Sequence, residues 1–351
     1  MHYRTRMITC SSIKFSRNQM GYDLRRNESV SEDYDDVFST NMYAKEAVDI
    51  IRSHDKSKPL FLYLAFMALH TPLVGLPPKK LRKKFSRNAG RFDLVIFLPG
   101  IILFHHYRGQ FEESPHEVRD IVLASLDDAV YKVVRELQSA GMYDNSVILV
   151  TTDNGGGPWY SNTPLRGTKE TLYEGGIRAA SFLLSPLLQQ PGRRYDGFLH
   201  LVDWTPTFLR LAGLRDAADD IDGQDVWDAI NNDEPVPRES IIHNIDEMKD
   251  KARWQATISK GSYKMIWGQD YLLKKSQKNQ ETNIQLYDVV KDPNESINIA
   301  DENKDIINEM KEIVLAAKEK RFVEADYPNG SKAGWPSNFD GIVSTNWCKS
   351  N

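Results

Sequence analysis

The 351-residue chain has the composition of an ordinary soluble protein, with 40% hydrophobic and 27% charged residues. Its formal net charge of −4 gives no reason to expect a nucleic-acid partner. Two cysteines are too few for a disulfide framework, and the length fits two domains, or one large α/β domain with a smaller companion.

Residues 1–38 are polar and aperiodic, which favours a loop or a partly disordered leader. The start of the chain has no apolar core of signal-peptide length, so no signal peptide is expected in the sequence as written. Apolar residues at helical spacing then predict a helix over 40–51. A continuous apolar run over 60–66 is typical of a buried strand, and His70 lies just past its end.

Residues 87–117 form an atypical stretch that we interpret as an insertion. Its apolar part, 87–106, is interrupted by Pro99 and Gly100 and is too short to span a bilayer, so no transmembrane segment is expected. A core strand, a membrane-touching loop, an exposed apolar insertion and intron sequence retained in the gene model all stay open as explanations.

Strands and helices alternate through the middle of the chain. Helical spacing predicts a helix over 119–141, and Asp203 is expected to cap a second helix over 204–211. Strands are predicted over 147–152 and 177–184. This alternation predicts a mainly parallel sheet with helices on both faces.

The predicted elements become shorter after about residue 235. The pattern indicates strands over 255–260, 263–267 and 286–290, and an amphipathic helix over 305–318. Antiparallel strands packed under one helix predict a small α+β domain at the C-terminal end.

The strand over 147–152 stops abruptly at Asp153, Asn154 and three glycines. Buried strands deliver ligands to the edge of an α/β sheet in this way, and an Asp–Asn pair suits a hard cation such as Ca²⁺ or Mg²⁺. Arg166 and Lys169 follow, and both can hold an oxyanion beside a metal. The Asp-Asn-Gly-Gly sequence is also a good turn, so the pattern alone leaves a purely structural interpretation open.

Several longer segments occur in the same order as in a known family. They are STNMYAKEAVDIIRSHDKSKPLFLYLAFMALHTPL (39–73), TTDNGG (151–156), PLRGTKETLYEGGIRAASFLLSPLL (164–188), HLVDWTPTFLRLAG (200–213), DGQDVWDAI (222–230), HNID (243–246), LYDVVKDPNE (286–295) and NFDGIVSTNWC (338–348). Together they closely resemble the sulfatase family, and within it the arylsulfatase B branch, the N-acetylgalactosamine-4-sulfatases. The resemblance covers nearly all of residues 35–348 outside the atypical stretch.

This resemblance implies an alkaline-phosphatase-like fold, with a mainly parallel sheet flanked by helices and a smaller C-terminal α+β domain. It divides the chain into a polar leader (1–38), the carboxyl-side part of a catalytic domain (39–234) and a small C-terminal domain (235–351). The implied activity is release of sulfate from an aryl sulfate or from sulfated N-acetylgalactosamine of glycosaminoglycans. The full-length parent is expected to be lysosomal or secreted.

The resemblance also assigns roles to individual residues. Asp153 and Asn154 are the implied ligands of one Ca²⁺, while His70 and Lys169 are assigned to the sulfate and to proton transfer near the leaving oxygen. Arg166 is expected to join the substrate-binding rim. Because His70 and Asp153 each follow a strand-like run, these side chains are expected to converge at one rim of the sheet.

One half of the implied active site is not found in the sequence. Sulfatases use a formylglycine made within a Cys/Ser-x-Pro-x-Arg signature, which occurs nowhere in this chain, and the strand ending in Asp-Asp is also missing. The chain therefore resembles the carboxyl-side part of a sulfatase, and weak calcium binding and no turnover are expected of it as written. Sequons at Asn27, Asn294 and Asn329 are candidate glycosylation sites, and His200 and His243 are expected to be structural.

Two alternatives of other classes stay open. A non-catalytic relative would bind sulfated glycans or a partner through Arg166 and Lys169. A hydrolase of the wider alkaline-phosphatase-like superfamily would act on phosphate esters, but it would need its own nucleophile at a strand end.

Overall fold

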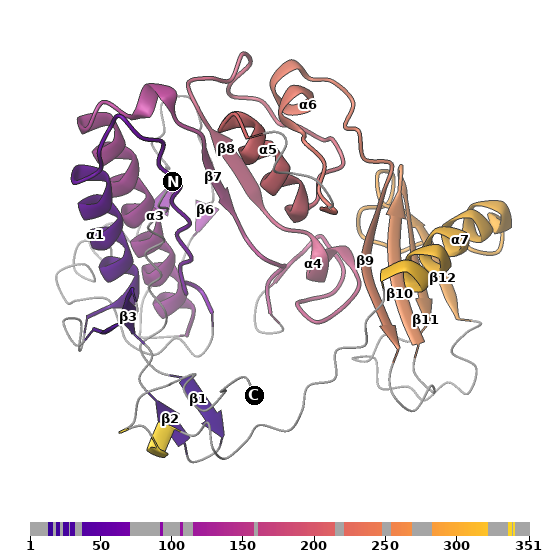
Figure 1. Ribbon diagram of the computed structural model, residues 1–351. Helices are drawn as coiled ribbons and strands as arrows, with labels where there is room; N and C mark the ends of the chain where they lie inside the picture. The colour runs from indigo at the N-terminus through magenta and orange to yellow at the C-terminus, as the bar shows by residue number, and fades with distance from the viewer. Residues whose placement is uncertain are drawn as a thin grey trace, which may run out of the picture. The chain divides into compact units, whose positions relative to one another are not determined.

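A computed structural model describes residues 13–16, 19–21, 24–27, 29–31, 37–70, 92–93, 106–107, 115–157, 161–214, 221–247, 254–268, 283–321, 336–338 and 340. The chain divides into two compact units, residues 1–145 with 327–351, and residues 146–326. Figure 1 gives the order of the helices and strands in each unit. The predicted domain boundary near residue 235 lies inside the second unit and stays a prediction.

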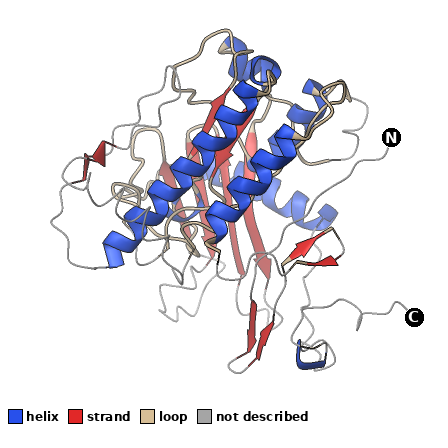
Figure 2. Ribbon diagram, turned by 90° about the vertical axis from the view of Figure 1, so that its left-hand side faces the viewer, coloured by secondary structure: helices blue, strands red, loops and turns tan. Residues whose placement is uncertain are grey.

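Two helices dominate the first unit. α1 (Ser39–Arg52) and α3 (Pro115–Ser139) confirm the predicted helices, and they lie side by side in the view of Figure 2. Their buried apolar residues recur at helical spacing, which is why each sequence forms a helix with one buried face. These residues are Met42, Tyr43, Ala47 and Ile51 in α1, and Val122, Ala129, Val134 and Leu137 in α3.

The amino-terminal segment contains short hairpins where a loop was expected. β1 (Ile13–Ser16) pairs with β2 (Gln19–Gly21), and β3 (Arg25–Arg26) pairs with β4 (Ser29–Val30), all antiparallel. Leu24 is 1% exposed and packs against α1, and Arg26 pairs with Glu46 of that helix over 2.5 Å, so these contacts attach the second hairpin to α1. Strands of two residues are too short for periodicity to reveal, which explains why the expectation was wrong here.

The predicted strand over 60–66 is not observed, since these residues belong to no described helix or strand. Exposure nevertheless alternates along the run, with Phe61 and Tyr63 76% and 82% exposed, while Leu64 and Phe66 pack on α1. A strand needs a neighbour to satisfy its backbone groups. Here a helix covers one side of the run, and no described strand pairs with it.

The atypical insertion is described only at two short strands and at residues 115–117, which begin α3. β5 (Phe92–Asp93) pairs with β6 (His106–Tyr107) in antiparallel fashion, while the rest of residues 87–114 lies outside the described residues. Among the helices that are described, none is long and apolar enough to span a membrane. The origin of the insertion stays a prediction.

The second unit opens with β7 (Ile148–Thr151) and β8 (Ser181–Leu184), which confirm two predicted strands. They pair antiparallel, with Ile148 opposite Leu184 and Thr151 opposite Ser181, and all other described strand pairs are antiparallel too. The described strands therefore do not show the predicted mainly parallel sheet. The intervening chain folds into loops and a short helix, α4 (Glu174–Ile177), at one end of β7, so β8 starts where β7 stops and runs back.

Among the described residues between β8 and β9, the chain forms three short helices. They are η2 (Leu201–Asp203), α5 (Trp204–Leu211) and α6 (Trp227–Asn232). Asp203 precedes α5 as predicted, but its side chain does not cap that helix. Its buried carboxylate instead accepts from the amides of His200 and Gln224 and binds Arg238, so this aspartate joins three segments of the unit.

The C-terminal part confirms the predicted α+β arrangement. β9 (Ser240–Glu247), β10 (Trp254–Lys260), β11 (Tyr263–Gly268) and β12 (Ile284–Asp288) form one antiparallel sheet in the order β12-β11-β10-β9. α7 (Lys304–Arg321) lies across one face of this sheet (Figure 1). Ile307, Met310 and Val314 of α7 enter a shared core with Ile258 and other sheet residues.

Met310→Ala is expected to destabilise this unit by about 2–5 kcal/mol, because Met310 is fully buried between α7 and the sheet and its loss leaves a cavity. Denaturant unfolding followed by the fluorescence of Trp267, which packs against the same core, measures the effect. Leu315→Ala on the same helix is the control, since Leu315 is 45% exposed and should change stability by less than about 0.5 kcal/mol. Equal effects of the two changes would contradict the placement of α7.

Candidate functional site

Backbone hydrogen bonds fasten the turn after β7 to the loop before α4. The amide of Lys169 donates to the carbonyl of Gly156 over 2.8 Å, and the amide of Gly155 donates to the carbonyl of Gly176 over 3.0 Å. The residues around Lys169 therefore lie against the turn that carries Asp153 and Asn154. Three of the predicted site residues are brought into one neighbourhood by the backbone.

A single amide side chain reinforces this junction. The Asn162 Oδ1 accepts from the amide of Gly156 over 2.9 Å, and its Nδ2 donates to the carbonyls of Gly156 and Gly167 over 3.0 and 3.1 Å. A primary amide can do this because it carries both an acceptor and two donors. Asparagine is also a common turn residue, so this role could not be predicted from the residue type.

Two glycines permit the close contact between the loops. A Cβ on Gly155 would lie 1.9 Å from the carbonyl oxygen of Gly175, and a Cβ on Gly175 would lie 2.4 Å from that of Gly167. Both distances are far inside van der Waals contact with rigid backbone. Glycine is required here by close approach, which any other side chain would prevent.

Asp153 and Asn154 offer oxygen atoms at the end of β7. Asp153 is exposed, while Asn154 is half-buried and its Nδ2 donates to the carbonyl of Gly155 over 2.8 Å, which leaves Oδ1 as an acceptor. Two such oxygens suit a hard cation in kind, but calcium takes six to eight ligands. Within the described ranges no group of three or more His, Cys, Asp or Glu residues is placed to hold a metal. The described oxygen atoms are therefore of the kind that binds a hard cation, but they are too few to complete the coordination of calcium.

Lys169, whose amide holds its loop against this turn, is half-buried. In the part of the chain that the structure describes, no carboxylate forms an ion pair with its ammonium group. A partly buried cation without an acidic partner is well placed to receive an external anion, because the protein does not neutralise it.

Arg166 is held by contacts within the unit. Its Nη1 donates to the carbonyl of Glu295 over 2.9 Å and to the Tyr287 hydroxyl over 3.3 Å, and its guanidinium carbon lies 4.1 Å from the centre of the Tyr173 ring. These contacts tie the loop that carries Lys169 to the segment after β12. Its predicted part in substrate binding stays a prediction.

A buried ion cluster lies behind the loop. Lys264 of β11 is fully buried, with its Nζ 2.7 Å from Glu295 Oε1 and 3.1 Å from Glu174 Oε1. The contact with Glu295 falls outside hydrogen-bond geometry and is ionic, whereas Glu295 Oε2 accepts from the amide of Glu174 over 2.7 Å. Burial raises the pKa of Glu295, against the opposing effect of Lys264. Sequence reasoning missed this cluster because its members come from three separate segments.

His200 and His243 have structural surroundings, as expected. The Nε2 of His243 lies 2.9 Å from the Ser259 hydroxyl, and burial, helped by the charge of Lys264, lowers the pKa of His243 to about 3. The Nδ1 of His200 accepts from the amide of Val202 over 3.4 Å, and burial lowers the pKa of this ring too. Both rings are therefore held in the neutral form at physiological pH.

His70 belongs to the other compact unit, where it is exposed and its amide donates to the carbonyl of Met67 over 2.8 Å. Its convergence with Asp153, Asn154 and Lys169 therefore stays a prediction. The candidate glycosylation sites Asn27 and Asn294 are exposed, whereas Asn329 lies outside the described residues.

Comparison with known proteins points to one family. A family model described as Sulfatase matches residues 1–214, and one described as N-sulphoglucosamine sulphohydrolase, C-terminal, matches residues 168–320. Arylsulfatase J of Mus musculus is 38% identical over 237 residues, which cover 66% of this chain and 36% of the relative. N-acetylgalactosamine-6-sulfatase of Rattus norvegicus is 30% identical over 198 residues, which cover 53% of this chain and 31% of the relative.

Solved structures share the fold. The crystal structure of Ps i-CgsB superimposes with a TM-score of 0.64 at 20% identity, over 95% of this chain and 65% of that chain. The chain spans about a third of the length of the two curated relatives above. These similarities support the family and do not specifically support the arylsulfatase B branch.

The buried cluster is expected to be strongly coupled. Lys264→Met should cost about 3–5 kcal/mol, because it leaves the carboxylate of Glu295 buried without its cation. The double variant with Glu295→Gln should lose clearly less than the sum of the single losses, as measured by a double-mutant cycle in denaturant. The exposed pair Lys260–Glu309 is the control, with an expected coupling below about 1 kcal/mol. Additive losses at Lys264 and Glu295 would show that the pair is not buried as described.

Stability should also fall in acid because of His243. An unfolded histidine has a pKa of about 6.5, so between pH 6.5 and about 3 the unfolded chain binds more protons than the folded one and stability decreases as pH falls. Between pH 8 and pH 5 this group accounts for a loss of about 2 kcal/mol. His243→Gln should remove that part of the pH dependence, whereas the control His54→Gln should retain it. The same slope in wild type and His243→Gln would refute the neutral buried state.

Proposed function

We propose that this chain, which belongs to the sulfatase family, carries one side of a site that hydrolyses sulfate esters. The observation that carries the proposal is the bond from the Lys169 amide to the Gly156 carbonyl, which holds the loop of this lysine against the turn that carries Asp153 and Asn154. A sulfate ester needs its negatively charged oxygens stabilised while the bond to the leaving oxygen breaks. A lysine and a metal site side by side suit that requirement.

Each residue has a definite part in this proposal. Asp153 and Asn154 hold a calcium ion, which when bound neutralises charge on the sulfate oxygens. Lys169 donates hydrogen bonds to the sulfate and can protonate the leaving oxygen. His70 joins the sulfate on the basis of the family resemblance alone. Arg166 keeps the Lys169 loop in position through Tyr173 and Glu295, and any direct contact it makes with substrate comes in addition.

The proposed substrate is sulfated N-acetylgalactosamine within a glycosaminoglycan. The resemblance points to the 4-sulfate, while a relative named N-acetylgalactosamine-6-sulfatase shows that the 6-sulfate must be compared with it. We further propose a lysosomal or secreted parent protein that carries glycans. The exposed Asn27, in the turn between β3 and β4, and the exposed Asn294 are compatible with that modification.

Binding and turnover have to be tested separately, because the 351 residues contain no formylglycine signature. The purified chain should bind N-acetylgalactosamine 4-sulfate in the presence of Ca²⁺, and Lys169→Gln should weaken this binding by about tenfold or more through the loss of a charge-assisted hydrogen bond. Titration calorimetry with the sulfated and the unsulfated sugar measures the difference. No sulfate should be released from an aryl sulfate by the same preparation.

Lys304→Gln provides the matched control, since Lys304 is an exposed lysine of α7 that pairs with Asp301. It should bind the sulfated sugar as the wild type does. Unchanged binding by Lys169→Gln would remove the observation on which the proposal depends. Sulfate release that disappears in Asp153→Ala would show instead that this chain contains its own nucleophile.

A further inference from the structure

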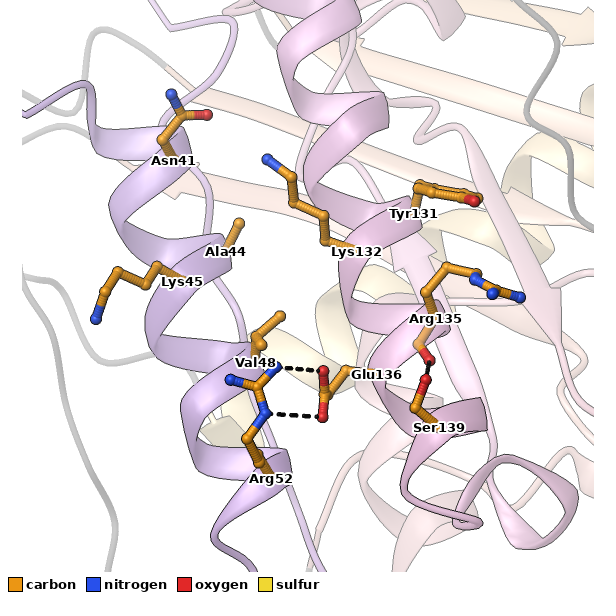
Figure 3. A pocket seen from close by; sticks show the side chains of 10 residues that line it. All are labelled: Asn41, Ala44, Lys45, Val48, Arg52, Tyr131, Lys132, Arg135, Glu136 and Ser139. Atoms are coloured by element: carbon orange, nitrogen blue, oxygen red, sulfur yellow. Dashed lines mark hydrogen bonds and ion pairs between the residues drawn. The ribbon is translucent and has the colours of Figure 1, made fainter.

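We propose that the groove between α1 and α3 is a second binding site, for the polymer backbone of a sulfated glycan. Ten residues line this groove, and Figure 3 shows them from close by. Four of them are cations, Lys45 and Arg52 from α1 and Lys132 and Arg135 from α3, while Glu136 is the one acid among the ten. The nature of the polymer rests on the proposed function, but the presence of four cations along the groove does not.

The acid in the groove is already neutralised. Arg52 donates two hydrogen bonds to the carboxylate of Glu136, from Nε over 3.2 Å and from Nη2 over 2.8 Å. Figure 3 shows this pair crossing from one helix to the other at one end of the groove. The pair links the two helices, and Lys132 and Arg135 of α3 are the groove cations on which the inference depends.

Lys45, Lys132 and Arg135 are exposed, and the contacts described for them lie within their own helices. Lys45 pairs with Asp49 and Lys132 with Asp128, in each case with an acid one turn away on the same helix, and the lysine side chains are 62% and 46% exposed. Arg135 donates to the neutral side chain of Gln138 over 3.2 Å. Exposed pairs of this kind contribute little to stability, so a strongly acidic ligand can replace them at small cost.

The arrangement favours an extended ligand over a single small anion. In Figure 3 Lys132 lies between the two helices, while Lys45 and Arg135 project from the sides of α1 and α3 that face away from each other. A small anion meets only one of these groups, whereas a polymer lying over both helices meets several, and the gain from linked contacts is multiplicative. Ala44 and Val48 form a floor without charge between them.

A glycan fits this surface better than a nucleic acid. Tyr131 is 49% exposed and is the one aromatic residue among those lining the groove, which suits contact with a sugar ring. Single-stranded nucleic acids are held by several aromatic side chains on which successive bases stack. The negative groups of a sulfated polysaccharide can bind to cations that are spaced along a surface, and α1 and α3 both provide such cations.

The test compares binding of size-fractionated chondroitin 4-sulfate to the purified chain and its variants. Lys132→Gln/Arg135→Gln should weaken binding by about tenfold or more at low salt, and the affinity of the wild type should fall as salt rises. Lys58→Gln/Lys291→Gln removes the same charge from two other exposed lysines and should bind like the wild type. Lys132→Arg/Arg135→Lys keeps the charge and should retain most of the affinity.

Lys169→Gln separates this inference from the proposed function. It should bind the polymer nearly as the wild type does while losing the sulfated monosaccharide. If the wild type does not bind the sulfated monosaccharide, while its binding of the polymer still depends on Lys132 and Arg135, the proposed function is wrong and the inference about the groove holds. Equal polymer binding by the groove and control variants, or displacement of the polymer by single-stranded DNA at equal charge, would overturn the inference.

Discussion

The position of the candidate site depends on one buried cation. Lys264 is fully buried in β11, and an ammonium group removed from water is stable only where carboxylates offset the lost hydration. Glu295 reaches it from the segment after β12, and Glu174 from the first turn of α4. Because Glu174 directly precedes the glycine that touches Gly155, the ion pairs that Lys264 makes help to fix the loops that carry Lys169 and Asp153.

Close contacts between glycines link the buried ion cluster to the loops of the candidate site. Gly175 lies against the carbonyl of Gly167, and Gly155 lies against that of Gly175, so three loop segments are stacked with no side chain between them. The close stacking also explains the direction of β8. A loop that must fold back to touch the end of β7 delivers the next strand to that same end, and the strand can only return antiparallel.

Local periodicity explains which elements were predictable. α1, α3 and α7 each show apolar residues at helical spacing over fourteen or more residues, and they form as predicted. The run over 60–66 looks like a strand, yet a strand also needs a partner, which is a tertiary property that the sequence of the run does not contain. β9 was not predicted for a related reason, because His243 and Asn244 interrupt its apolar pattern. Both residues have partners in the neighbouring strand β10, where His243 contacts Ser259 and Asn244 pairs with Thr257.

Two lysines show why the site itself is harder to read from sequence than the helices. Lys169 precedes a glutamate and Lys264 lies in an apolar run, so the pattern suggests a surface position for the first and gives no partner for the second. In the structure Lys264 is enclosed by two carboxylates and is unavailable to any ligand, whereas Lys169 is half-exposed and no described carboxylate pairs with it. Lys264 therefore affects the candidate site only indirectly, because by holding Glu174 and Glu295 it helps to fix the loop that carries Lys169.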